Sequence, residues 1–113
     1  MKRLVVQIRK FSEILDSLIV KRKVTKEDFE DFEKRLIENT EEGDVVQGTG
    51  GLRKTRLKSA TKGKSGGFRV CYCDVPEKGK LFLISLFAKN VQENLAQEDI
   101  NILKLLVARL KKE

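Results

Sequence analysis

Two apolar runs joined by a tight turn occupy residues 68–89, which read FRVCYCDVPEKGKLFLISLFAK. In the first run, residues 68–75, apolar side chains alternate with Arg69 and the cysteines, which predicts a strand with one apolar face. The second run, residues 81–89, is apolar on both faces and predicts a central strand. Because a proline and a glycine bound the turn, the two strands are expected to pair antiparallel, with Arg69 held on a strand rather than on a loop.

Upstream of this hairpin, the apolar pattern predicts one strand and two helices. Residues 4–8 form a short apolar run that is typical of a strand. Apolar residues then recur at helical spacing from Phe11 to Ile19. A second helix is expected to begin after Thr25, whose hydroxyl can cap it, and to end near Asn39.

The remaining segments complete the expected fold. Residues 43–51 are rich in glycine and predict a loop, and residues 52–59 predict a strand in which a bulge is allowed. Residues 97–112 predict a helix with acids at its start and bases at its end. The fold class is therefore α+β: a small antiparallel twisted sheet packed against two N-terminal helices, with a C-terminal helix.

The composition restricts the kind of protein. The 113 residues are 40% hydrophobic and 36% charged, enough for one core, so residues 1–113 are expected to form a single domain. With no histidine and two cysteines, the chain lacks the usual general base and the ligands for a zinc site, and we expect no metal and no cofactor. Neither a signal peptide nor a membrane span is evident, which predicts a cytoplasmic protein.

Positive charge is concentrated in one segment. The net charge is +7, from 24 Lys and Arg against 17 Asp and Glu, and residues 45–73 hold seven bases and no acid. The rest of the chain is therefore neutral. A run of bases without carboxylates repels itself unless it binds an anion, and a polyphosphate backbone is the usual one. A solvated basic face is the simpler alternative, but it does not explain why acids are missing.

Several other features have structural explanations. Cys71 and Cys73 are expected to pack as small residues against the last helix, and Tyr72 to belong to the core rather than to stack on a base. The glycines of residues 48–51 indicate a turn or a close approach to a ligand with equal weight. The C-terminal helix is more typical of core than of an interface.

Two strings in this chain resemble the HigB branch of the RelE toxin superfamily. They are GDVVQGTGGLRKTR at residues 43–56 and GKSGGFRVCY at residues 63–72, followed by Lys89-Asn90 and Asn94-Leu95. The resemblance implies the same fold and the toxin of a type II toxin-antitoxin pair. It implies an endoribonuclease, an mRNA interferase that cleaves translating mRNA in the ribosomal A site and inhibits translation. The implied partner is a HigA-type helix-turn-helix antitoxin, through which alone operator DNA is contacted, and no membrane is involved.

The resemblance also implies site residues, carried over position by position. The catalytic set is Arg56, Lys62, Lys64, Arg69 and Lys89. The expected RNA or ribosome contacts are Arg53, Lys54 and Lys58, and for Arg53 and Lys58 the alternative is that they are only solvated charges. Two departures from the family pattern are the absence of a C-terminal tyrosine and Ala96 where a serine often caps the last helix.

These residue types suit RNA cleavage without a metal. The 2′-hydroxyl attacks the adjacent phosphate, so a site must accept a proton, stabilise a dianionic phosphorane and protonate the leaving oxygen. Arg69 and Arg56 can clamp the phosphate, and a lysine crowded by cations can transfer a proton. Which lysine does so stays open among Lys62, Lys64 and Lys89.

Two other functions compete with this one. A ParE-like toxin of the same fold inhibits DNA gyrase through protein contacts, and a non-catalytic RNA-binding module needs no histidine, acid pair or metal ligand. The full set of cations with Arg69 and Lys89 near strand ends favours the nuclease over the gyrase inhibitor.

Overall fold

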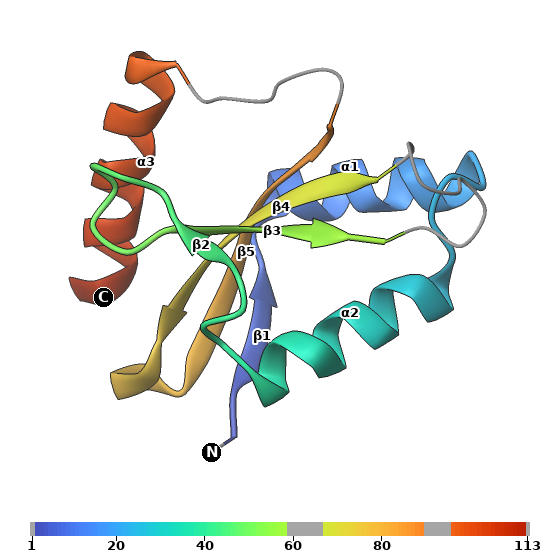
Figure 1. The fold of residues 1–113 in the computed structure, drawn as a ribbon, viewed down its shortest axis with the longest axis horizontal. Coiled ribbons are helices and arrows are strands. Elements are labelled where there is room, and N and C mark those ends of the chain that lie inside the picture. Colours follow the sequence, from blue (N-terminus) through green and yellow to red (C-terminus); the bar gives the residue numbers. More distant parts are fainter. Residues whose placement is uncertain (1, 59–66, 90–95, 113) are drawn as a thin grey trace.

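A computed structural model describes residues 2–58, 67–89 and 96–112 (Figure 1). The fold is α+β, as predicted, and its elements follow the predicted order with one added strand. They are β1 (Leu4–Gln7), α1 (Arg9–Val20), α2 (Lys26–Glu38), β2 (Asp44–Val45), β3 (Arg53–Leu57), β4 (Phe68–Val75), β5 (Lys80–Ala88) and α3 (Gln97–Lys112). Within these ranges, no helix is long and apolar enough to cross a membrane.

The five strands form one sheet in the order β1-β5-β4-β3-β2. The β2–β3, β3–β4 and β4–β5 pairs are antiparallel, whereas β1 runs parallel to β5. The sheet predicted as antiparallel is thus corrected to a mixed one. Because β5 is apolar on both faces, it lies inside the sheet with a neighbour on each side. β1 fills the place on the side away from β4.

Two local features differ from the sequence prediction. The segment predicted as a loop between residues 43 and 51 contains β2, in which Asp44 pairs with Lys54. The bulge allowed in residues 52–59 lies elsewhere. β3 pairs with β4 without interruption, and the register shift falls between Cys71 and Tyr72, opposite β5. The turn between β4 and β5 is as predicted, a short 3-10 helix followed by Gly79 with φ +63°.

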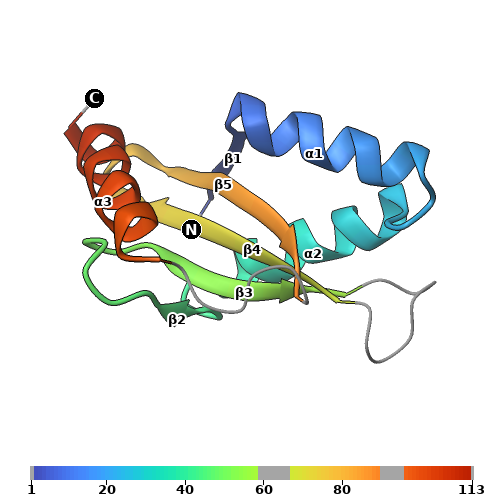
Figure 2. The same cartoon turned by 90° about the horizontal axis from the view of Figure 1, so that it is seen from above.

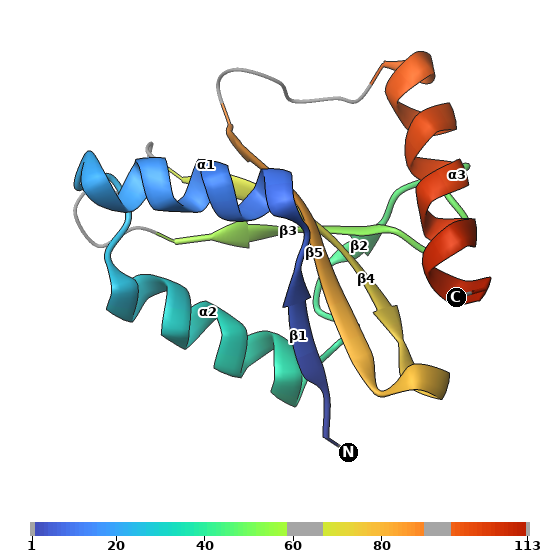
Figure 3. The ribbon, with the colours of Figure 1, turned by 180° about the vertical axis from the view of Figure 1, so that it is seen from behind.

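Helices α1 and α2 cover one face of the sheet (Figures 2 and 3). Phe11 of α1 and Phe32 of α2 are buried in one cluster with Val70 and Tyr72 of β4, which confirms the predicted apolar face of that strand. α2 begins as expected, because the Thr25 side chain caps it in a capping box with Asp28.

Helix α3 packs on the opposite face of the sheet. Its Leu103 and Val107 are buried with Cys71 and Cys73, so the predicted location of the cysteines is confirmed. The glycine-rich loop contacts α3, since the Lys111 ammonium donates to the Gly50 carbonyl at 2.7 Å. This contact gives the loop a structural role. α3 covers only one end of this face, and the start of β4, the strand that contains Arg69, lies beyond it (Figure 1).

Candidate nucleic-acid site on the open sheet face

One row of side chains crosses the open face on three strands. Arg56 of β3 lies directly opposite Arg69 of β4, and Arg69 lies opposite Phe87 of β5. Directly opposed residues in an antiparallel pair share a face, with Cβ atoms about 5 Å apart. Strand pairing therefore places two guanidinium side chains and an aromatic ring side by side.

A second row lies next to the first. Asp44 of β2 is opposite Lys54 of β3, which is opposite Cys71 and then Ser85. Alternation along β3 puts Lys54 on the same face as Arg56. Among the described residues, these rows thus bring together three cations from the basic segment and one carboxylate from the edge strand.

Arg69 has a buried donor that is not used. Its Nη1 atom has no hydrogen-bond partner among the described residues, although the atom is shielded from solvent. A Cβ atom built on Gly67 would lie 3.7 Å from this Nη1 and 3.7 Å from the Arg56 Cγ, so the two arginine side chains lie close together. A buried N–H group without an acceptor is costly, and a guanidinium matches the oxygens of a phosphate. This arrangement suits a bound anion.

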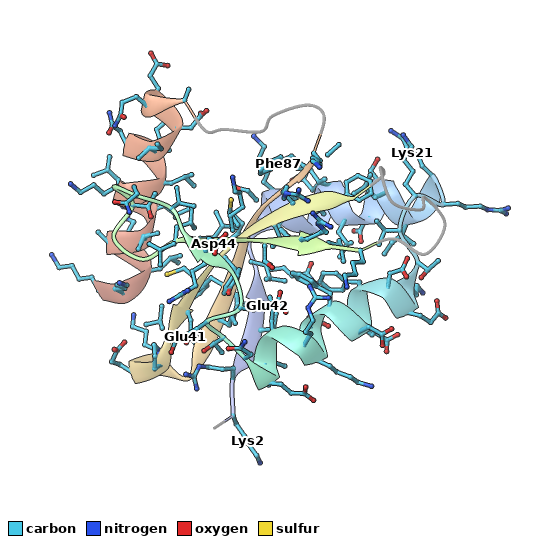
Figure 4. All side chains as sticks on the ribbon, in the orientation of Figure 1. Lys2, Lys21, Glu41, Glu42, Asp44 and Phe87 are labelled. Atoms are coloured by element: carbon cyan, nitrogen blue, oxygen red, sulfur yellow. The ribbon has the colours of Figure 1, made fainter. Side chains whose placement is uncertain are left out.

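A cavity of about 240 Å³ lies at the edge of β3, where pairing with β2 stops. It is lined by Glu42, Gly43, Asp44, Lys54, Thr55, Arg56 and Arg69. Its walls therefore combine the cations of both rows with two carboxylates, one just before β2 and one at its start (Figure 4).

The two carboxylates differ in whether other side chains bind them. Glu42 forms an ion pair with Arg35 and accepts a hydrogen bond from the Thr55 hydroxyl at 2.6 Å. Burial acts to raise the pKa of Glu42, but the hydrogen bonds from Arg35 and Thr55 and the nearby positive charges outweigh it and lower the pKa. Asp44 is exposed, and no hydrogen bond or ion pair joins its carboxylate to another described residue. Of the two, Asp44 is thus the one available to a ligand.

The structure separates one predicted contact from the others. Arg53 lies opposite Tyr72, on the face that α1 and α2 cover. Its guanidinium donates to the carbonyls of Gly43 at 2.6 Å and Glu41 at 3.2 Å. The sequence predicts Arg53 to be an RNA contact, and the structure places its guanidinium at the turn before β2.

The other predicted residues are placed as follows. Lys58 is exposed just after β3, and its charge acts on Glu42. Lys89 is exposed after β5, and its backbone N–H donates to the Gly67 carbonyl at 3.3 Å, two residues before Arg69. Lys62 and Lys64 lie outside the described residues.

Sequence reasoning missed Asp44 and Phe87. Asp44 was hidden because its segment was predicted as a loop, although the β-branched pair Val45-Val46 is a strand signal. Phe87 belongs to a run that is apolar on both faces, so no alternation marked it as half-buried on the open side. Both side chains are labelled in Figure 4.

Thiol and metal chemistry find no support in the described part of the chain. Cys71 and Cys73 are buried free thiols, and burial raises the pKa of Cys71 to about 11. Such a thiol stays protonated and is a poor nucleophile. The described ranges contain no cluster of three or more metal-ligating side chains.

Comparison with known proteins identifies the family. The family described as the RelE toxin of the RelE / RelB toxin-antitoxin system matches residues 12–113. The chain therefore belongs to the RelE toxin family. It is accordingly a toxin with a cognate antitoxin partner. A solved structure of the Escherichia coli toxin RelE, a mutant with two arginines replaced by alanine, in the free state, has a similar fold. Its TM-score is 0.54 at 19% sequence identity, over 94% of this chain and 97% of that one.

Proposed function

We propose that this toxin is a ribosome-dependent endoribonuclease of the HigB branch that cleaves translating mRNA in the A site. The observation that carries the proposal is the buried Nη1 of Arg69, which has no partner among the described residues, together with the cationic cavity that Arg69 helps to line. Toxins of the RelE family are generally endoribonucleases. A phosphate of the RNA would supply the acceptor that the Arg69 Nη1 lacks among the described residues.

The proposed reaction needs no metal. The 2′-hydroxyl attacks the adjacent phosphate, leaving a 2′,3′-cyclic phosphate and a 5′-hydroxyl. Arg69 and Arg56 hold the phosphate and offset the charge that grows in the transition state. Among the lysines, Lys62, Lys64 and Lys89 are proposed to move protons. Lys54 and Lys58 are proposed to contact RNA or the ribosome, and Arg53 is left out because it faces the other side.

The ribosome is proposed to position the substrate. The chain has one tyrosine, six phenylalanines and no tryptophan, and most of the aromatic rings are in the core. Phe87 is half-buried next to Arg69 and offers one ring for a base. Holding an RNA in line for attack requires more contacts than this face provides, and the ribosome supplies that positioning.

The proposal extends to the partner and the compartment. We infer that the antitoxin is of the helix-turn-helix HigA type, and that operator DNA is bound only through it. Translating ribosomes are cytoplasmic, so the toxin acts there.

Replacement of Arg69 tests this function. Arg69→Ala and Arg69→Met, the second of which keeps the apolar stem, are expected to reduce cleavage of mRNA on programmed ribosomes by at least about 100-fold. Arg9→Ala removes the same charge from the exposed start of α1 and is expected to cleave like the natural chain.

The readouts are fragment formation on gels and the urea midpoint of each variant. Cleavage at the natural rate by Arg69→Ala would contradict the proposal. Growth arrest with intact mRNA and broken or relaxed DNA would point to gyrase inhibition instead.

A further inference from the structure

The cavity at the edge of β3 contains a carboxylate that the phosphate-binding role does not explain. Asp44 lies opposite Lys54 and lines the same cavity as Arg56 and Arg69. A negative charge at this place repels an RNA phosphate and weakens its binding. A cavity that only bound an anion would be better without it.

The backbone that carries Asp44 is held rigidly. The N–H of Gly43 donates to the Tyr72 hydroxyl at 2.9 Å, and the Gly43 carbonyl accepts from Arg53 at 2.6 Å. A Cβ atom on Gly43 would lie 2.8 Å from the Lys54 carbonyl oxygen, so β3 approaches the turn as closely as glycine allows. Groups from β3 and β4 thus fix the residue directly before Asp44, as expected for a preorganised site.

We propose that Asp44 is the general base that accepts the proton of the 2′-hydroxyl. This inference rests on the ribonuclease function proposed above. The 2′-oxygen forms a bond to phosphorus while its proton passes to the Asp44 carboxylate. The bond between phosphorus and the 5′-oxygen breaks, and that oxygen takes a proton from a lysine ammonium of the site. Water then takes the proton from Asp44 and restores the lysine.

A carboxylate suits this role better than the lysines around it. An ionised carboxylate has lone pairs ready to accept a proton, whereas an ammonium has none until it loses its own proton. Glu42 is a poorer candidate because Arg35 and Thr55 already occupy its oxygens. In this proposal Arg56 and Arg69 hold the phosphate, and Asp44 activates the nucleophile.

A structural role for Asp44 is the alternative, since a cross-strand pair with Lys54 can stabilise β2. The two roles differ in what Asp44→Asn changes. Loss of a structural pair lowers stability and weakens every function together. Loss of the base slows the chemical step while binding stays the same or becomes tighter, because a repulsive charge is removed.

The test compares Asp44→Asn with Glu41→Gln on programmed ribosomes under single-turnover conditions. Glu41→Gln is the matched control, because Glu41 is an exposed carboxylate of the same turn that does not line the cavity. Asp44→Asn is expected to slow cleavage by at least about 100-fold with a Kd for ribosomes no weaker than that of the natural chain. Glu41→Gln is expected to cleave normally. Asp44→Glu, which keeps the carboxylate, is expected to cleave faster than Asp44→Asn and covers the case in which that variant unfolds.

A modified substrate distinguishes a general-base role of Asp44 from a general-acid role. With sulfur in place of the leaving 5′-oxygen, protonation of the leaving group is no longer needed. The defect of Asp44→Asn is expected to persist on this substrate, and its disappearance would overturn the inference by assigning Asp44 to the leaving group. Normal cleavage by Asp44→Asn would overturn the inference and leave the ribonuclease function intact. No cleavage by the natural chain would instead overturn the function itself.

Discussion

Arg69 and Tyr72 of β4 both have buried polar atoms, and these atoms differ in whether they have hydrogen-bond partners. The Tyr72 hydroxyl donates to the Thr40 carbonyl at 2.9 Å and accepts from the Gly43 N–H at 2.9 Å. The Nη1 of Arg69 has no partner among the described residues. The first arrangement stabilises the fold, whereas the second leaves a buried donor unsatisfied, which is the reason for proposing a ligand at Arg69.

Tyr72→Phe should destabilise the protein and leave the cationic side chains of the site in place. The change leaves the buried N–H of Gly43 and the Thr40 carbonyl without their partner, which we expect to lower the free energy of unfolding by about 1–3 kcal/mol. Urea denaturation followed by circular dichroism measures the effect. An unchanged midpoint would show that water replaces the hydroxyl at no cost.

The burial of Tyr72 could be predicted, but its hydrogen bonds could not. Alternation with Arg69 and Cys71 assigned the ring to the apolar face of a strand, and the structure confirms that assignment. Its partners Thr40 and Gly43 are 32 and 29 residues away in the chain, in a turn whose position depends on how β2 pairs. No local pattern carries that information.

At the scale of elements, α2 is fastened to the edge of the sheet next to the site. Arg35 in its last turn forms an ion pair with Glu42 and donates to the Arg56 carbonyl at 2.7 Å. Glu42 also accepts from Thr55 of β3. One carboxylate therefore links a helix, the turn that leads to Asp44, and a strand of the site.

This link predicts a loss of stability in acid. The pKa of Glu42 is lowered in the folded protein, so its contribution is fully present above its ordinary value of 4.5 and is lost as pH falls through the lower folded value. Glu42→Gln should lose about 1 kcal/mol at pH 7 and show a weaker decline in stability below pH 4.5. Urea midpoints measured from neutral pH into the acid range for both proteins check this. Parallel curves would contradict the assignment.

The elements themselves show which information is local. The capping box at Thr25 and the turn after Val75 are short-range signals, and both features formed where they were expected. The parallel pairing of β1 with β5 joins strands that are distant in the chain, as the Leu4 and Lys80 pair shows, and β2 has only two residues. Such pairings depend on tertiary packing, so sequence patterns did not reveal them.

At the scale of the whole molecule, helices and charges are divided between two sheet faces. α1 and α2 cover one face, and α3 covers one end of the other. Lys54, Arg56 and Arg69 come from a segment that carries the whole excess of positive charge, and strand pairing gathers them on the part that the described helices leave open. A large anionic partner can approach a surface of this kind.

How much of the site could be predicted follows from the same division. The basic segment and the resemblance pointed to Arg56 and Arg69, and β3–β4 pairing places them opposite each other. Asp44 and Phe87 join them only through the register of β2 and β5, which the residue types do not encode.

The most direct test of the central claim is a map of mRNA 5′ ends after the toxin is expressed from a tightly repressed promoter. We predict new ends within translated codons, absent when the message is not translated and absent with Arg69→Ala. Growth arrest without new ends would contradict the account, as would cuts that appear equally in untranslated RNA.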